Sequence, residues 1–452
     1  MLSLLRLACL LLLISVISSL EIRNLTVGVS LTISGGTTRL PSGLAVLHGL
    51  QFWERWYATA PPELQLFNFS NGTYRIVLDI RDDQGLPELV AAHYQAFLED
   101  PQIALCLGPI NSDFSMIAKN ILDGKKMLLQ TAAGADATSV GSLSTFGIIV
   151  PASLVWRPAL LQARLSGATS FAYIAEENSY QQTLCKGTLS LGHEVGLGLP
   201  ICNFSVPSSL GVIDGNITLA YQQAVEKLAM SPECASADVL LLCSYYAGAT
   251  IMISHMKNID FLPKQILAAP FTNQYDTDPN ALYLSGATTW NPKVRFPADP
   301  YYGSPLDFTR DFEQQFNYTP DFYDALGAAA PLYLSDTLRR AKSLDYTELI
   351  FAMERIDLST FYGRLTYGTA HKPLIDSIIL QYQPSENLSL VEKTVVAPPT
   401  AQIASLIYPI PLWDQREPDY GWMNYWGDIL MSVITGISIL FSLVCILYRL
   451  LS

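Results

Sequence analysis

A polar turn directly after an apolar run is the first place where this sequence could do chemistry. In ALCLGPINSDFS (104–115), the apolar run ends at a Gly-Pro pair, and Asn111, Ser112 and Asp113 follow. N–H groups that open a helix favour an anion, and hydroxyl or amide side chains add hydrogen bonds. The same side chains would equally cap a helix at 112–122. The stretch therefore predicts an anion-binding turn, a helix cap, or both.

Motifs typical of enzymes are absent from this sequence. It has no Gly-X-Ser-X-Gly elbow, no His-Glu-X-X-His and no phosphate-binding Gly-X-X-X-X-Gly-Lys. The pair His193-Glu194 reads as a solvated helix end, and DDQG (82–85) reads as a turn. No Cys-X-X-Cys spacing occurs, so a zinc site is not expected. The sequence predicts a protein that is not an enzyme and has no cofactor.

The two ends of the chain are apolar and indicate an extracellular protein. Residues 1–20 have the layout of a secretory signal peptide, with one early cation and an apolar run before small side chains. Residues 429–448 carry no charge and are long enough to span a bilayer, so a tail at 449–452 would face the cytosol. The proline- and aromatic-rich stretch 397–428 reads as a stalk. The sequence therefore predicts a single-pass type I protein of the cell membrane.

Charge and glycosylation signals agree with an extracellular location. The chain has 27 Lys and Arg against 40 Asp and Glu, a net charge of −13, which argues against a nucleic-acid partner. An Asn-X-Ser/Thr triplet that carries a glycan must lie on the surface. The sequence predicts glycosylation at Asn24, Asn68, Asn71, Asn203, Asn216, Asn317 and Asn387.

Strands and helices alternate along the ectodomain in two series. Such alternation predicts parallel sheets with helices on both faces, whose ligands bind beyond the carboxyl ends of the strands. The first series has strands at 25–34, 74–85, 103–107 and 126–133, and helices at 42–58, 88–98 and 112–122. The second has strands at 170–177, 197–204, 237–246, 264–270 and 283–290, and helices at 154–165, 180–191, 219–230 and 249–257. The sequence thus predicts an α/β protein with two lobes.

Six segments, in their order along the chain, resemble the type 1 periplasmic binding proteins. They are VGVSLTISGG, DIRDDQG, CLGPINS, FAYIAEENSYQQTL, FYDALGAAAPLYLSDTLRRA and FYGRLTYGTAHKP. The resemblance is to the leucine/isoleucine/valine-binding branch and to the receptor ligand-binding domains built from it. It implies a clamshell of two Rossmann-like lobes that closes on a small ligand. Lobe 1 is expected at 21–150 and 272–356, and lobe 2 at 151–271 and 357–396.

The resemblance also implies ligand-binding positions. Those that match are Asn111, Ser112, Ala132, Gly134, Tyr180, Tyr245 and Tyr246. In amino-acid-binding members the serine of the Gly-Pro turn, here Ser112, holds the ligand carboxylate. The threonine that grips the α-amino group is Gly134 here, and no acidic residue stands near Pro270 to pair with that group. The resemblance therefore implies a small, anionic ligand that is not a simple α-amino acid; ordinary packing at a strand end is the alternative role of the tyrosines.

These features predict a receptor-like cell-surface protein that binds a small extracellular molecule between its lobes. Because the cytosolic tail is so short, signalling would need a partner chain or a homodimer, and the small residues Ser432 and Gly436 would allow helix contact within the span. The alternative is an adhesion or assembly module that uses the clamshell as a protein-interaction surface. An open cleft lined by polar and aromatic groups would favour the first role, and a filled cleft the second.

Five cysteines lie between the predicted signal peptide and the predicted span, so at least one is unpaired within the chain. Cys185 near the start of a lobe 2 helix and Cys202 late in the next strand both lie toward the cleft, which predicts a Cys185–Cys202 disulfide. A strand separates Cys234 from Cys243, and the partner of Cys234 stays open. Cys106, inside a strand of lobe 1, is predicted to be a free thiol.

Overall fold

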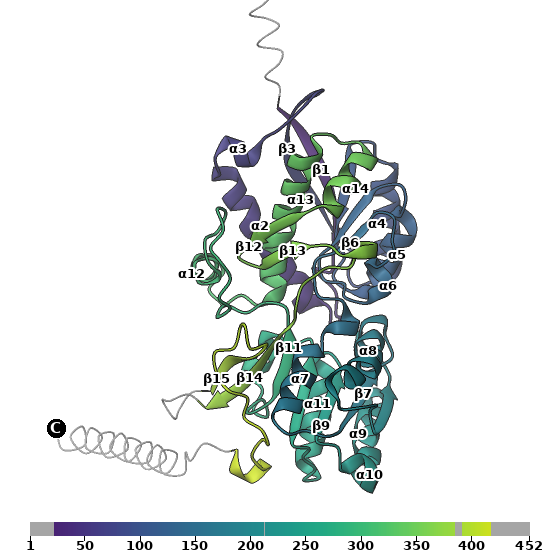
Figure 1. The fold of residues 1–452 in the computed structure, drawn as a ribbon. Helices are drawn as coiled ribbons and strands as arrows, with labels where there is room; N and C mark the ends of the chain where they lie inside the picture. The colour runs from purple at the N-terminus through teal and green to yellow at the C-terminus, as the bar shows by residue number, and fades with distance from the viewer. Residues whose placement is uncertain (1–21, 212, 385–390, 417–452) are drawn as a thin grey trace, which may run out of the picture.

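The computed structural model describes residues 22–211, 213–384 and 391–416, which form two α/β lobes (Figure 1). The predicted signal peptide, membrane span and cytosolic tail lie outside these residues, as does Asn387. Within the described residues, no helix combines the length and the apolar character that crossing a membrane requires.

The first lobe is built on a six-stranded sheet in the order β2-β3-β1-β4-β5-β6, parallel except for β2 at one edge. The strands are β1 (Ile22–Leu31), β2 (Phe67–Phe69), β3 (Gly72–Asp82), β4 (Ile103–Leu107), β5 (Met127–Gln130) and β6 (Thr145–Gly147). The helices are α2 (Leu40–Thr59), α3 (Pro62–Gln65), α4 (Pro87–Glu99), α5 (Ser112–Leu122), α6 (Asp136–Ser139), α12 (Pro305–Phe316), α13 (Phe322–Ala341) and α14 (Tyr346–Glu354).

The second lobe is built on a seven-stranded sheet in the order β15-β14-β11-β10-β9-β7-β8. Its strands β7 to β11 are parallel, and β14 and β15 are antiparallel additions at one edge. The strands are β7 (Phe171–Glu176), β8 (Cys202–Val206), β9 (Val239–Cys243), β10 (Gln265–Ala269), β11 (Ser285–Thr288), β14 (Ile378–Pro384) and β15 (Val391–Ala397). The helices are α7 (Arg157–Leu165), α8 (Ser179–Val195), α9 (Gly215–Met230), α10 (Pro232–Ala235) and α11 (Tyr246–Asn258).

Helices α2 and α13 of lobe 1 pack against one another at two glycines. A Cβ on Gly49 would lie 2.1 Å from the carbonyl oxygen of Asp324, and a Cβ on Gly327 would lie 2.3 Å from that of Val46. Only glycine allows two backbones to approach so closely. The contact fixes the starts of these two helices, which border the space between the lobes, relative to each other.

The two-lobe α/β fold predicted from the sequence is confirmed, and the segments cross between the lobes at other places than expected. Strand β11 pairs with β10 and β14 in the second sheet, although 272–356 is predicted for lobe 1. The hairpin of β12 (Asp357–Thr360) and β13 (Gly363–Thr366), predicted for lobe 2, lies with lobe 1. The hydroxyl of Tyr367 ties it there by donating to the carbonyl of Gly147 at 2.9 Å.

Residues 398–416, which we call the C-terminal segment, pack on lobe 2. The N–H of Ile410 donates to the carbonyl of Lys264 at 2.9 Å. The indole N–H of Trp413 donates to the carbonyl of Phe261 at 3.0 Å. The part of the predicted stalk that the structure describes is therefore docked on this lobe.

The disulfides differ from the predicted Cys185–Cys202 pair. Cys185 on α8 is bonded to Cys243 at the end of β9, and Cys202 is bonded to Cys234 on α10. Cys106 is free and buried.

The physical reason for the different pairing is the position of β8. The sequence predicts a strand at 197–204, which would place Cys202 near its carboxyl end and the cleft. Instead, Gly196 and Gly198 adopt positive φ values of 80° and 75° in a turn, and β8 begins only at Cys202. This cysteine therefore lies at the amino end of its strand, remote from the cleft.

Candidate functional site

A cavity of about 460 Å³ lies between the two lobes, where strands β1, β9 and β10 end. Lobe 1 contributes the turn after β1 and the start of α13, and lobe 2 contributes the start of α11 and the residues after β10. The lining residues are Gly36, Thr37, Thr38, Leu40, Pro41, Ser42, Gly211, Ile213, Tyr245, Tyr246, Ala247, Pro270, Thr272, Gln274 and Tyr323.

The lining is mainly apolar and contains three tyrosines and four serine or threonine hydroxyls, and none of the lining residues is charged. The ring of Tyr246 meets Tyr275 edge to face at 4.8 Å, which fixes its plane. Burial raises the pKa of Tyr245 well above its usual value, so its phenol stays neutral. Tyr323 supplies a third ring from lobe 1. The cavity therefore matches a small ring-bearing molecule better than an ammonium group, for which it offers no carboxylate.

Thr38 joins the two lobes at the edge of this cavity. Its hydroxyl donates to the carbonyl of Ser209 at 2.7 Å and accepts from the N–H of Gly211 at 3.1 Å. Both partners belong to the lobe 2 loop that follows β8. These two bonds hold the lobes together at this edge of the cavity, in a closed arrangement.

The Gly-Pro turn after β4 is buried in this arrangement and does not line the cavity. The side-chain oxygen of Asn111 accepts from the N–H of Phe114 at 2.9 Å and caps α5. The hydroxyl of Ser112 accepts from the N–H of Ala135 at 3.0 Å. The amide nitrogen of Asn111 is buried without a partner among the described residues. Capping, one of the two roles predicted for this turn, is therefore present, and one donor remains for a ligand or a water molecule.

Gly134 and Tyr180 form a direct contact between the lobes. A Cβ on Gly134 would lie 2.6 Å from Cε2 of Tyr180, so the ring of Tyr180 fills the space that a side chain at 134 would take. Beside this contact, the N–H of Ser179 donates to the carboxylate of Asp113 at 3.2 Å. Ala132 is partly buried and packs on the hydrophobic core. The deep part of the predicted site is thus filled by protein side chains.

Arg39, at the start of α2, is a cation that the sequence patterns did not single out. Its guanidinium carbon lies 4.7 Å from the ring centre of Phe114, and its Nε is buried without a partner among the described residues. Burial lowers the pKa of Arg39, while Tyr245, Asp113 and Asp83 act in the opposite direction. The positive charge of Arg39 therefore lies next to the cavity between the lobes.

Glu176 is a fully buried carboxylate beneath the lobe 2 side of the cavity. Its oxygens accept from the N–H and hydroxyl of Ser209 at 3.0 and 2.7 Å. They also accept from the Ser244 hydroxyl at 2.5 Å, and from the Tyr245 N–H and the Asn178 amide at 3.1 Å each. Burial raises the pKa of Glu176, and hydrogen bonds from Ser209 and Ser244 offset part of this shift. The carboxylate holds the start of α11, and with it Tyr245, against the end of β7.

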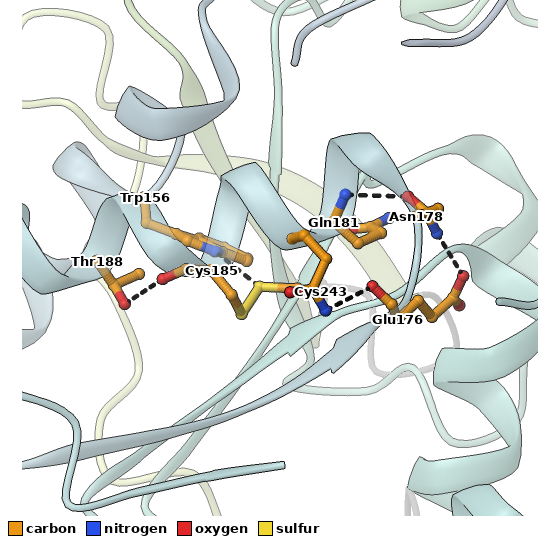
Figure 2. The surroundings of a disulfide bond; sticks show 8 residues. Trp156, Glu176, Asn178, Gln181, Cys185, Thr188 and Cys243 are labelled. Carbon is orange, nitrogen blue, oxygen red and sulfur yellow. Dashed lines mark hydrogen bonds between the residues drawn. A yellow bond between two sulfur atoms is a disulfide. The ribbon is translucent and has the colours of Figure 1, made fainter. Parts of the chain in front are cut away.

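Figure 2 shows how α8 is fixed beside this carboxylate. The Cys185–Cys243 disulfide joins the helix to β9, and the indole N–H of Trp156 points at the sulfur of Cys243, 3.4 Å away. Asn178 caps the helix by accepting from the N–H of Gln181 at 3.0 Å. This cross-link rigidifies the element that carries Tyr180.

The predicted glycosylation positions that the structure describes all lie on the surface. Surface exposure is the condition that a glycan imposes. The exposed asparagines are Asn24, Asn68, Asn71, Asn203, Asn216 and Asn317.

The structure separates the predicted site residues. Tyr245 and Tyr246 line the cavity, Gly134 and Tyr180 contact each other between the lobes, and Asn111 and Ser112 make their hydrogen bonds within lobe 1. Sequence reasoning missed the turn 36–42, which supplies six of the lining residues. The sequence did contain a signal for this turn. The polar, glycine-containing stretch SGGTTRLPS follows the first predicted strand, just as the Gly-Pro turn follows the third predicted strand.

Comparison with known proteins gives one consistent result. Residues 24–386 match a family model described as periplasmic binding protein. The leucine-binding protein LivK from Thermotoga maritima is 16% identical, with a TM-score of 0.65 over 83% of this chain and 99% of that one. A solute-binding protein from R. palustris in complex with benzoate is 16% identical, with a TM-score of 0.64 over 85% of this chain and 99% of that one. At this identity the two structures establish a shared fold.

Proposed function

The chain belongs to the periplasmic binding protein family, and on that basis we propose that it is a non-catalytic, receptor-like protein that binds a small molecule between its two lobes. The single observation that supports this most directly is the cavity of about 460 Å³, because residues from both lobes line it. A ligand there would stabilise the closed arrangement, since opening the lobes would expose it.

The lining favours a ligand with a ring and without an ammonium group. Three tyrosines offer ring faces and hydroxyls, and no lining residue carries the negative charge that an α-amino group needs. Arg39 beside the cleft would tolerate or attract an anionic oxygen. The benzoate in the similar R. palustris structure is a ligand of this kind, whereas leucine carries an ammonium group.

A change at Tyr245 should weaken ligand binding while a change at Ser112 should not. Tyr245→Ala removes a lining ring and is expected to weaken the binding of a small aromatic ligand about tenfold or more. Ser112→Ala leaves the N–H of Ala135 without its acceptor and is expected to lower the free energy of unfolding by about 1 kcal/mol at unchanged affinity. A thermal-shift screen of the purified full-length chain against small aromatic and aliphatic acids would find the ligand, and calorimetric titration would compare the variants.

The opposite pattern would relocate the site. If Ser112→Ala weakened binding and Tyr245→Ala did not, the ligand would contact the Gly-Pro turn. If no compound in a broad screen raised the melting temperature of the wild-type chain, the proposed function itself would fail.

We further propose that the protein is anchored in the cell membrane by 429–448, with its lobes outside the cell, and that it acts through a partner chain or a homodimer. The predicted signal peptide and the exposed sequon asparagines support an extracellular position. Protease added to intact cells is expected to remove nearly all of the chain. Permeabilised cells serve as the positive control, and an ectodomain that is protected in intact cells would contradict this orientation.

A second role, as an interaction module, is favoured by the filled part of the cleft. The contact of Gly134 with Tyr180 and the bond from Ser179 to Asp113 join the lobes directly. A clamshell closed in this way would present a fixed outer surface to a protein partner. The ligand screen described above decides between the two roles.

A further inference from the structure

A second cavity, of about 670 Å³, is lined mostly by lobe 2, with Thr319 of lobe 1 at its edge, and shares no lining residue with the cavity between the lobes. The segment after β10, strands β14 and β15, and the C-terminal segment enclose it. Charged and aromatic side chains line it, in contrast to the uncharged lining of the first cavity. It is therefore a separate place with its own chemistry.

Two of the three lysines that line this cavity have carboxylate partners. The ammonium of Lys393 lies 2.8 Å from Asp276 and 2.5 Å from the side-chain oxygen of Asn273. Lys293 pairs with Glu392. These two pairs contribute little net charge, and besides its arginine the cavity is also lined by one further cation and one further anion, Lys257 and Asp278.

Arg416 is different from both lysines. Its side chain is buried, with a residue exposure of 7%, and its guanidinium carbon lies 3.9 Å from the ring centre of Trp413. Nε donates to the carbonyl of Pro411 at 2.9 Å, and Nη1 reaches the carbonyl of Leu282 only at 3.4 Å. Nη2 is buried without any partner among the described residues. Arg416 lines the cavity, and the Nη2 edge of its guanidinium has no hydrogen-bond partner among the described residues.

The charge of Arg416 is poorly compensated within the described residues. Its hydrogen bonds go to neutral carbonyl groups, and burial lowers its pKa to about 10. A buried guanidinium without an anion is unfavourable, because water has been removed and no negative charge replaces it. The planar fork of arginine suits the paired oxygens of a carboxylate or a phosphate.

We propose that this cavity binds a small molecule through an anionic oxygen group, carboxylate or phosphate, that pairs with the free edge of Arg416. Trp413 holds the guanidinium plane from one side, so the cation is oriented before the ligand arrives. The carboxylate of Asp276 does not oppose the anion, because Lys393 and the hydroxyl of Tyr382 already bond to it. The site is independent of the cleft and would let a second compound act on the same lobe.

The test uses the full-length chain and inorganic phosphate at constant ionic strength, with acetate as a second probe. Phosphate is expected to raise the melting temperature of the wild-type chain in a saturable manner. Arg416→Gln should weaken its apparent affinity about tenfold or more, because a charge-assisted bond is lost. Arg355→Gln is the matched control, since the side chain of Arg355 is 57% exposed and remote from the cavity; it should respond as wild type does.

A second variant at the same position keeps the result decisive. Arg416→Lys retains the charge if Arg416→Gln does not fold, and it should bind phosphate about threefold or more weakly, because the planar N–H pair is gone. Equal responses in wild type, Arg416→Gln and Arg416→Lys would overturn the proposal. Loss of binding at the cleft in Tyr245→Ala leaves this result untouched, so the two sites are tested separately.

Discussion

Replacing Cys185 and Cys243 together by alanine is expected to lower the free energy of unfolding by about 4 kcal/mol. The disulfide closes a sequence separation of 58 residues, and the chain-entropy model gives about this value for such a loop. Both residues are almost fully buried, at 1% and 0% exposure, so a packing loss adds to the effect. Chemical denaturation of the oxidised full-length chain, followed by tryptophan fluorescence, would measure it.

Cys106→Ala provides the matched control for this substitution. Cys106 is equally buried but free, so its replacement removes a sulfur atom without opening a cross-link and should cost about 1 kcal/mol. Peptide mapping without reduction should recover Cys185 linked to Cys243 and Cys202 linked to Cys234. Recovery of a Cys185–Cys202 peptide would contradict both the pairing and the position of β8.

Replacing Glu176 by glutamine is expected to cost about 3 kcal/mol. Five donor groups point at the two carboxylate oxygens, and an amide turns one of those oxygens into a donor. At least two buried donors then lose their acceptor, each at about 1 to 3 kcal/mol. Denaturation midpoints would report the loss, and ligand affinity should fall as well, because the carboxylate positions the start of α11.

The neighbouring residue supplies the control for this change. Glu177 is exposed, so Glu177→Gln makes the same chemical change one position along the chain and should leave stability almost unaltered. A Glu176→Gln variant as stable as Glu177→Gln would show that the buried carboxylate does not organise this part of lobe 2.

The sequence was sufficient for elements whose pattern is local. The strand predicted at 103–107 is β4 residue for residue, because an apolar run buried on both faces is bounded by turn-forming residues. The strand predicted at 197–204 starts too early, because β8 begins at Cys202 and the leucines before it alternate with glycines that form a turn; Leu199 is 56% exposed. An apolar run alone does not distinguish a strand from a turn whose leucines face solvent.

The site was predictable only where a single strand end determined it. Tyr245 and Tyr246 follow a buried strand and line the cavity as expected from their position. The closure of Tyr180 on Gly134 depends on how two lobes meet, and nothing local to either residue encodes it. The free edge of Arg416 likewise depends on the docking of the C-terminal segment.

With the proposed anchor at 429–448, the docking of the C-terminal segment on lobe 2 would determine which lobe moves relative to the membrane. Ile410 and Trp413 fasten this segment to lobe 2, so an anchor at 429–448 would hold lobe 2 as the stationary base. Lobe 1 would then be the lobe that moves, and its far end would change position relative to the membrane when the cleft opens. Two fluorophores, one on each lobe, would show motion relative to the bilayer for lobe 1 alone. A partner chain that responds to ligand binding would need to contact lobe 1.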